Sequence, residues 1–237
     1  MYSEEVVFDA GDQKLAGTMI YADNGRRPSI AHLHGLGPTA SRHQVRYLLD
    51  PLAEHGYGSL TFEYSGNGDS TGVMEESCIA RRMAETLAAV SLLDPDEPPL
   101  LIGGSMGCHL AASLVPTIKP RGLVFFVPAA YPGGAEHLVF DENRARAGNY
   151  ADSAAFAGMR EFDGDLLIIA GKHDQIVPSD VVGGYLDSAR NARSTEVIWL
   201  EGDHFVHRWL PGPDWATERA AVQEALLRFV STDYARR

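Results

Sequence analysis

The chain has 237 residues, of which 45% are hydrophobic and 22% are charged, and its formal net charge is −12. This size suits a single α/β domain with enough buried core to fold without disulfides or a metal ion. The negative charge disfavours nucleic acid or an anionic membrane as a partner, because phosphate binding needs clustered Lys and Arg. The only two cysteines, Cys78 and Cys108, exclude a disulfide framework and a four-cysteine zinc site.

Targeting and membrane segments are not expected from the sequence. Residues 1–10 hold neither a basic region nor an apolar core of signal-peptide type. No apolar run approaches the length of about 18 residues that a membrane span requires. We therefore expect a cytoplasmic protein that acts on a small molecule, and a homodimer stays open as its oligomeric state.

The first third of the chain predicts a hairpin followed by alternating strands and helices. Residues 5–10 and 14–22 alternate in polarity around Gly11-Asp12, which predicts the hairpin. Short apolar runs at 29–35 and 58–64 predict strands, and apolar residues recur at helical spacing in 41–56 and from Ile79 to Val90. A glycine-rich loop, 65–72, follows the second of these strands.

The rest of the chain continues the same alternation. Apolar runs at 99–104, 122–127, 165–171 and 195–202 predict buried strands, and 106–115 and 216–230 predict helices. Near-continuous apolar strands separated by helices favour a mostly parallel sheet covered on both faces. We predict one domain over 1–237. Residues 132–163 are too long for a simple connection, so we predict a lid insertion there.

The pattern Gly-X-Ser-X-Gly occurs twice, around Ser105 at 103–107 and around Ser70 at 68–72. In a nucleophile elbow a strand enters the turn and a helix leaves it, which holds the serine on a strained backbone. Ser105 has a predicted strand immediately before it and a predicted helix immediately after it. Ser70 lies in a polar loop, where a serine typically bonds the local backbone. The sequence therefore favours Ser105 as the nucleophile.

A serine nucleophile needs a base and a group that orients the base. Asp174 follows the strand 165–171, and His204 follows the strand 195–202. Because the carboxyl ends of parallel strands meet at one edge of the sheet, we expect both side chains to converge on Ser105. The order serine, acid, histidine also fits this arrangement.

Other acids and histidines fit the site less well. Asp180 lies near a predicted helix start, where it would act as a cap, and Asp203 adjoins His204 and would point away from it. His173 and His207 are expected to be solvated loop residues. The remaining histidines show no spacing typical of a metal site, so we expect no metal and no cofactor; they are His32, His34, His43, His55, His109 and His137.

The motifs HLHGLG, EYSGNGDSTG, GGSMG, GKHDQIVP and EGDHF follow one another in the chain. In order and spacing they resemble the α/β-hydrolase superfamily, most closely its small single-domain esterases and serine peptidase-like hydrolases, the group that includes cinnamoyl (feruloyl) esterases. The resemblance spans nearly the whole chain and is weakest at 132–163. It implies an oxyanion hole formed by the backbone N–H groups of Leu36 and Met106. Glu63 stands where many relatives carry aspartate.

These features predict a serine hydrolase that cleaves a carboxylic ester through an acyl-enzyme on Ser105. Thioester or amide cleavage, acyl transfer in a biosynthetic pathway, and a non-catalytic binding protein stay open as alternatives, because a triad does not define its leaving group. Aromatic residues of the insertion are expected either to line the cleft or to pack the lid onto the body; they are Phe140, Tyr150, Phe156 and Phe162. Three arginines are candidates to meet an acidic substrate, namely Arg144, Arg146 and Arg160.

Overall fold

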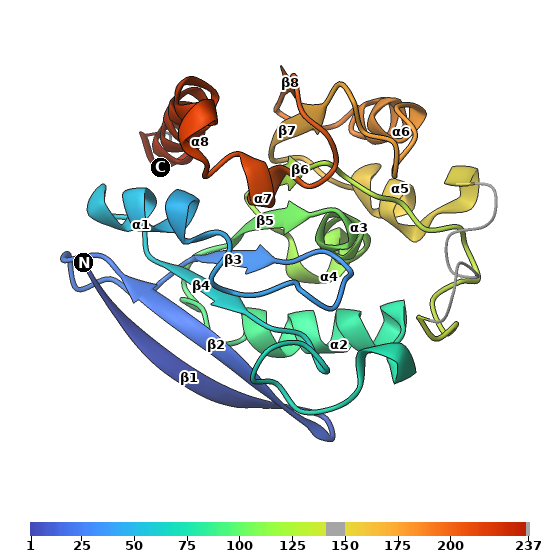
Figure 1. The fold of residues 1–237 in the computed structure, drawn as a ribbon, viewed down its shortest axis with the longest axis horizontal. Helices are drawn as coiled ribbons and strands as arrows, with labels where there is room; N and C mark the ends of the chain where they lie inside the picture. The colour runs from blue at the N-terminus through green and yellow to red at the C-terminus, as the bar shows by residue number, and fades with distance from the viewer. Residues whose placement is uncertain (141–149, 236–237) are drawn as a thin grey trace.

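The structure is a computed structural model that describes residues 1–140 and 150–235. Its first half begins with the strands β1 (Tyr2–Ala10), β2 (Gln13–Tyr21) and β3 (Ile30–Leu33), helix α1 (Arg46–Glu54) and strand β4 (Ser59–Phe62) (Figure 1). A short 3₁₀ helix η1 (Met74–Glu76) and helix α2 (Ile79–Val90) lead to β5 (Leu100–Gly104), α3 (Met106–Ser113) and α4 (Val115–Ile118).

The second half supplies the other edge of the sheet. It contains β6 (Gly122–Phe126), η3 (Tyr150–Asp152), α5 (Ala154–Met159), β7 (Asp165–Gly171), α6 (Asp180–Ser188) and β8 (Ser194–Leu200). Helix α7 (Val206–Trp209), η4 (Pro213–Trp215) and the long helix α8 (Ala216–Ala235) close the chain. The predicted alternation of strands and helices is therefore confirmed.

Eight strands form one sheet in the order β1-β2-β4-β3-β5-β6-β7-β8. The β1–β2 and β2–β4 pairs are antiparallel, and every later pair is parallel. The predicted hairpin turns at Gly11, whose φ of 65° suits glycine. The predicted α/β-hydrolase fold, with its mostly parallel sheet, is confirmed.

Helices cover both faces of the sheet, as Figure 1 shows. Alternate residues of each buried strand point to opposite faces, so Leu101 and Leu123 join one core while Ile102 and Val124 join the other. Helices α2, α3, α5 and α6 pack on the first core, and α1 and α8 pack on the second. Both faces are apolar because parallel strands are buried on each side.

The predicted insertion at 132–163 is only partly described, since 141–149, with Arg144 and Arg146, lies outside the described residues. Its last part forms α5, which packs directly on α3. A Cβ atom at Gly158 would lie 2.0 Å from the Ala112 carbonyl oxygen, so the two helices approach backbone to backbone. This end of the insertion is therefore anchored to the body of the protein.

The glycine-rich loop 65–72 is organised by a buried carboxylate. Glu63, at the end of β4, forms an ion pair with Arg42 and accepts hydrogen bonds from Ser41 Oγ at 3.0 Å and from the Asp69 N–H at 3.0 Å. Its side chain is 2% exposed. A Cβ atom at Gly68 would lie 2.1 Å from this carboxylate, so the loop folds closely around it.

Glu63→Gln keeps the side-chain shape but removes the charge from this pair. We expect it to lower the free energy of unfolding by about 3 kcal/mol, because Arg42 and the loop N–H lose a buried charged acceptor. The control is Glu196→Gln, which breaks the half-exposed ion pair with Arg228 and is expected to cost less than about 1 kcal/mol. Equal losses in urea unfolding for the two variants would contradict this interpretation.

Candidate active site

Ser105 occupies a strained turn between β5 and α3. Its φ of 49° and ψ of −110° lie where residues with a side chain are rare. The turn needs glycine on both sides: a Cβ atom at Gly103 would lie 2.6 Å from the Cys108 nitrogen, and one at Gly107 would lie 1.9 Å from the Leu33 carbonyl oxygen. The predicted strand–turn–helix context of Ser105 is confirmed, and the strain presents its hydroxyl at the end of the sheet.

Three side chains meet beyond the carboxyl ends of β5, β7 and β8. Ser105 Oγ lies 2.9 Å from His204 Nε2, and His204 Nδ1 lies 2.7 Å from Asp174 Oδ2. The histidine and aspartate side chains are only 10% and 11% exposed. The three residues predicted to act together thus form one continuous chain of hydrogen bonds.

Asp174 is held as a carboxylate by its surroundings. Its Oδ1 accepts hydrogen bonds from the Ile176 and Val177 N–H groups, each at 2.9 Å. Burial raises the pKa of Asp174, but the hydrogen bonds from His204 and from these N–H groups outweigh burial and leave the pKa below its ordinary value. The ionised carboxylate fixes the His204 ring with a proton on Nδ1, which leaves Nε2 free to accept the Ser105 proton.

The competing residues have other roles. Ser70 Oγ donates to the Glu63 carbonyl oxygen at 2.6 Å and accepts from the Ala16 N–H at 2.9 Å, so it braces the loop as predicted. Asp203 points away from His204 and accepts from the Phe205 N–H at 2.8 Å. Asp180 is the exposed first residue of α6, and the cap position belongs to Ser179. His173 is 66% exposed beside Glu201, as a solvated loop residue should be.

The prediction that His207 is a solvated loop residue was wrong. His207 lies on α7 and is half-buried, with its Nε2 atom shielded from solvent and its Nδ1 atom 3.0 Å from the Tyr47 hydroxyl. Burial, reinforced by the nearby His204, lowers its pKa to about 4. A helix of four residues is too short to show a helical pattern in the sequence, so the inward direction of this side chain could not be predicted.

The loop after β3 lies directly against the elbow. A Cβ atom at Gly35 would lie 3.2 Å from both the Gly104 carbonyl oxygen and Ser105 Cβ, and Leu36 lines the cavities beside Ser105. Within 1–140 and 150–235, neither the Leu36 N–H nor the Met106 N–H donates to a protein acceptor. These are the two N–H groups that the resemblance assigns to an oxyanion hole.

His34 fixes the orientation of the peptide bond between Gly35 and Leu36. Its Nε2 accepts a hydrogen bond from the Tyr64 N–H at 3.0 Å, which leaves Nδ1 as the donor to the Gly35 carbonyl oxygen at 2.7 Å. Burial lowers the pKa of His34 to about 4, so the ring is neutral near pH 7 and this assignment holds. Because a trans peptide directs C=O and N–H to opposite sides, the bond to Gly35 also orients the Leu36 N–H. Nothing in the sequence distinguished His34 from the other histidines, so this role was not predicted.

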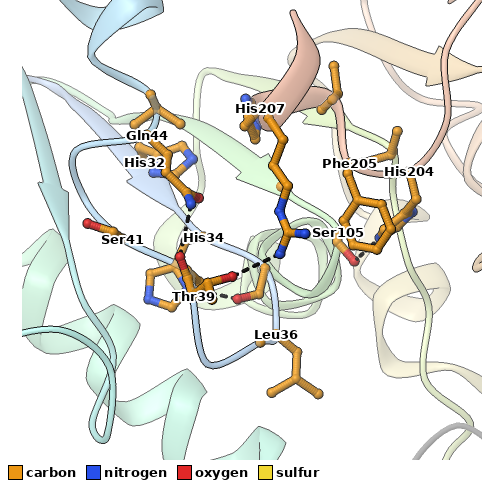
Figure 2. A pocket seen from close by; sticks show the side chains of 18 residues that line it. His32, His34, Leu36, Thr39, Ser41, Gln44, Ser105, His204, Phe205 and His207 are labelled. Carbon is orange, nitrogen blue, oxygen red and sulfur yellow. Dashed lines mark hydrogen bonds between the residues drawn. The ribbon is translucent and has the colours of Figure 1, made fainter. Parts of the chain in front are cut away.

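Two cavities flank Ser105. One, of about 110 Å³, runs between the loop after β3 and the segment 204–208, with histidine and hydroxyl side chains in its wall (Figure 2). The other, of about 150 Å³, is walled mainly by apolar residues, among them Leu36, Ala129, Val177 and Pro178. A substrate bound at Ser105 can therefore extend into both cavities.

Of the four aromatic residues of the insertion that the sequence offered for the cleft wall, only Tyr150 lines a cavity beside Ser105. Phe140 is buried, with its ring 5.7 Å from the Arg82 guanidinium, and Phe156 packs edge-on against Tyr185. Phe162 is also buried in the core. These three rings pack the insertion onto the body, which was the second of the two predicted roles.

The described residues contain no cluster of three or more His, Cys, Asp or Glu side chains arranged to hold a metal ion. None of the described helices is both long enough and apolar enough to cross a membrane.

Comparison with known proteins decides the family. The sequence profile of the alpha/beta hydrolase family matches residues 30–234. The chain belongs to this family. Among curated proteins, this α/β-hydrolase is 31% identical over 106 residues to lysophosphatidylserine lipase ABHD12 of Bos taurus and 32% identical over 95 residues to that of Xenopus tropicalis. The matched segments cover 44% and 40% of the α/β-hydrolase and only 26% and 24% of those relatives.

Solved structures share the fold over nearly the whole chain. Est1E from Butyrivibrio proteoclasticus, with ferulic acid bound, matches 97% of this α/β-hydrolase and 99% of its own chain, with a TM-score of 0.72 and 18% identity. The thioesterase domain from the curacin biosynthetic pathway matches 96% and 100%, with a TM-score of 0.69 and 14% identity. At these identities the likeness concerns the fold. The predicted similarity to esterases of this superfamily is confirmed.

Because the backbone at Ser105 is strained, we expect the usual order of stability of alanine and glycine variants to be reversed at this position. Ser105→Gly is expected to be more stable than Ser105→Ala by about 1 kcal/mol, because glycine adopts positive φ without the steric cost of Cβ. Both variants lose the hydroxyl, so the lost bond to His204 cancels. At Ser113, the last residue of α3, φ is not positive, so the glycine variant is expected to be less stable than the alanine variant. Urea unfolding of the four variants tests this, and glycine being less stable at both positions would contradict it.

Proposed function

We propose that this protein is a serine hydrolase that cleaves carboxylic esters through an acyl-enzyme on Ser105. The observation that carries the proposal is the hydrogen-bonded chain from Ser105 Oγ through His204 to Asp174, at 2.9 Å and 2.7 Å. A serine hydroxyl is a poor nucleophile until a base accepts its proton, and this chain supplies the base and the group that orients it.

The reaction proceeds in two stages. His204 Nε2 accepts the Ser105 proton as Oγ attacks the ester carbon, and then donates it to the leaving alcohol. Asp174 stabilises the imidazolium that forms between these steps. Water, deprotonated by His204, then attacks the acyl-enzyme, and His204 returns that proton to Ser105 Oγ as the bond to the acyl group breaks and the acid leaves. Each stage passes through a tetrahedral intermediate whose negative oxygen needs hydrogen-bond donors.

The backbone N–H groups of Leu36 and Met106 supply those donors. Met106 N–H is at the start of α3, where a helix leaves its first N–H groups without partners and where its dipole favours negative charge. Leu36 N–H is oriented through His34, which makes His34 a positioning residue. A preformed donor lowers the barrier because it requires no reorientation during the reaction.

The apolar cavity beside Ser105 fits the acyl part of an ester. Its wall includes Tyr150, Val177 and Ala129, so an acyl chain would be bound mainly by burial of its surface. We further propose that the whole chain is one catalytic domain and that the described part of 132–163 near Tyr150 bounds this cavity. Two similar proteins support ester hydrolysis as the proposed reaction: ABHD12 is a lipase, and Est1E binds ferulic acid.

Ser105→Ala is expected to lower kcat on short p-nitrophenyl esters by at least about 10⁴-fold, because it removes the nucleophile. Ser70→Ala is the matched control from the second copy of the motif and is expected to keep activity close to wild type in correctly folded protein. A fluorophosphonate probe followed by peptide mapping should label Ser105 in the wild type. Full activity of Ser105→Ala, together with loss of activity in Ser70→Ala, would show that Ser70 and not Ser105 is the nucleophile.

A matched pair of acyl esters and acyl thioesters separates the proposal from its nearest alternative. The neighbour from the curacin biosynthetic pathway is a thioesterase domain with the same fold, so the fold alone does not distinguish ester from thioester cleavage. Higher kcat/KM on the ester with the same acyl group supports an esterase. A strong preference for the thioester would change the leaving group while keeping the role of Ser105.

His34→Ala is expected to lower kcat by about 10- to 100-fold with little change in KM, because the Gly35–Leu36 peptide is no longer held in orientation. Affinity for a trifluoromethyl ketone, which resembles the tetrahedral intermediate, should fall in parallel with kcat/KM. A purely structural role would lower stability without this selective loss.

The matched control is His109→Ala. His109 is also buried and also accepts a hydrogen bond from a tyrosine N–H, that of Tyr131, at 3.3 Å. This variant is expected to lose stability while its affinity for the ketone changes less than that of His34→Ala. The same loss of ketone affinity in both variants would contradict the positioning role of His34.

A further inference from the structure

The end of β6 and the turn after it hold the backbone of Ser105 from two sides. The Ser105 N–H donates to the Phe126 carbonyl oxygen at 2.9 Å, and the Ser105 carbonyl oxygen accepts from the Ala129 N–H at 3.2 Å. The same turn borders the site, since Val127 lines one cavity beside Ser105 and Ala129 lines the other. The nucleophile is therefore fixed by a segment that is also part of the wall around it.

This pair of bonds departs from a regular parallel ladder by one residue. In such a ladder a residue donates to the neighbour before its partner and accepts from the neighbour after it. Strands β5 and β6 lie side by side (Figure 1), and their register, continued past its last pair, places Ser105 opposite Val127. The regular donor to the Ser105 carbonyl oxygen would be residue 128, but Pro128 has no N–H, and the bond comes from Ala129 instead. The turn contains one extra residue and is a β-bulge.

Val127 bears the backbone cost of the bulge. Its φ is 45°, a conformation that a β-branched side chain disfavours strongly. Within 1–140 and 150–235, the non-glycine residues with positive φ are Ser105, Lys119 and Val127. Lys119 caps the end of α4, where a left-handed residue is common. The other two lie opposite each other beside the nucleophile, and strain of this kind persists only where the surrounding structure fixes it.

The strained turn is anchored at both ends. The Val127 N–H donates to the Ile169 carbonyl oxygen at 2.8 Å, which holds the start of the turn against β7. The Ala129 carbonyl oxygen accepts from the buried Tyr185 hydroxyl at 2.7 Å, which holds its end against α6. Neither anchor involves the elbow, so the position of the Ala129 N–H is set by the body of the protein.

The bulge fixes the direction of the Met106 N–H. The Ser105 carbonyl and the Met106 N–H belong to one trans peptide, so they point in opposite directions. Helix α3 supplies one donor to this carbonyl oxygen, the Cys108 N–H at 3.0 Å, and the bulge adds a second, the Ala129 N–H. Because rotation of the peptide would break both bonds, the Met106 N–H keeps its direction.

We propose that the bulge at residues 127–129 is a positioning device for the oxyanion hole. Pro128 withholds the regular donor and Val127 adopts a strained backbone, so that the next N–H along the chain reaches the Ser105 carbonyl oxygen. This bond holds the Met106 N–H in the direction in which a tetrahedral intermediate can use it. The inference rests on the ester hydrolysis proposed at Ser105, and it assigns a role to residues that supply no reacting group.

The Ala129 N–H can be removed without changing a side chain. Lactic acid, incorporated at position 129 of the full-length protein by nonsense suppression, keeps the methyl group and replaces the N–H by an ester oxygen. We expect kcat on p-nitrophenyl butyrate to fall about tenfold with little change in KM, because the Met106 N–H is still present but less well held. Affinity for a trifluoromethyl ketone, which forms a tetrahedral adduct with Ser105, should fall by the same factor.

The matched control is lactic acid at position 135. Ala135 is also a buried alanine outside the helices and strands, and its N–H donates to the Pro132 carbonyl oxygen at 3.3 Å. It lines neither cavity beside Ser105. This variant is expected to lose stability in urea unfolding through its missing bond, while kcat and ketone affinity stay within about twofold of wild type.

A second pair of variants tests the strain itself. Val127→Gly and Val127→Ala both truncate the side chain, but only glycine adopts positive φ without a steric cost. We expect the glycine variant to unfold at the higher urea concentration. The opposite order would show that the turn stores no strain at Val127, which would overturn this part of the proposal.

The remaining outcomes separate the bulge from the reaction. If lactic acid at position 129 lowers stability but leaves ketone affinity unchanged, or if both lactic acid variants lose ketone affinity equally, the positioning role is refuted while ester hydrolysis stands. If the wild type cleaves no p-nitrophenyl ester and a fluorophosphonate does not label Ser105, the proposed function itself fails.

Discussion

The geometry of the site depends on a backbone-to-backbone contact between α3 and β3. Gly107 approaches the Leu33 carbonyl oxygen so closely that even one added carbon, at 1.9 Å, could not be accommodated. This contact sets how sharply the chain turns at Ser105. It also fixes the point at which the chain leaves β3, and therefore where Gly35 and Leu36 lie against the elbow. The nucleophile and the loop that carries the Leu36 N–H are thus positioned by one packing constraint, which only glycine satisfies.

The acid and the base are held by a second backbone contact, between the turns that follow β7 and β8. The His173 N–H donates to the Gly202 carbonyl oxygen at 3.1 Å, and a Cβ atom at Gly171 would lie 2.6 Å from the same oxygen. Asp174 and His204 are therefore carried by two turns that bond to each other as well as by adjacent parallel strands. The side chains of Asp174 and His204 retain little freedom once their backbones are fixed. The backbone contact therefore helps to hold the hydrogen bonds of 2.7 Å and 2.9 Å in place.

The sequence predicted those parts of the site that follow directly from the order of strands. Ser105, Asp174 and His204 each come immediately after a run of buried apolar residues, and such runs are the strongest signal in an α/β chain. His32, His34 and His207 gave no such signal. They come from β3, from the loop after it and from the short helix α7, and only the folded chain brings His207 beside His32, 175 residues earlier. The sequence could not decide whether Phe140 and Phe156 line a cavity or pack in the core, because an apolar ring suits both places equally well.

Of the histidines around Ser105, only His204 faces a carboxylate within the described part of the chain, and this difference separates its role from those of the others. Burial holds the pKa of His34 and His207 near 4 and that of His32 well below its usual range, so all three rings are neutral near pH 7. A positive charge on any of them would oppose the formation of an imidazolium on His204, since like charges disfavour each other in a water-poor site. Neutral rings can instead donate and accept hydrogen bonds beside the nucleophile without that electrostatic cost. His204 differs because its Nδ1 faces the Asp174 carboxylate, and this one carboxylate is what lets a single imidazole in the cluster carry the proton.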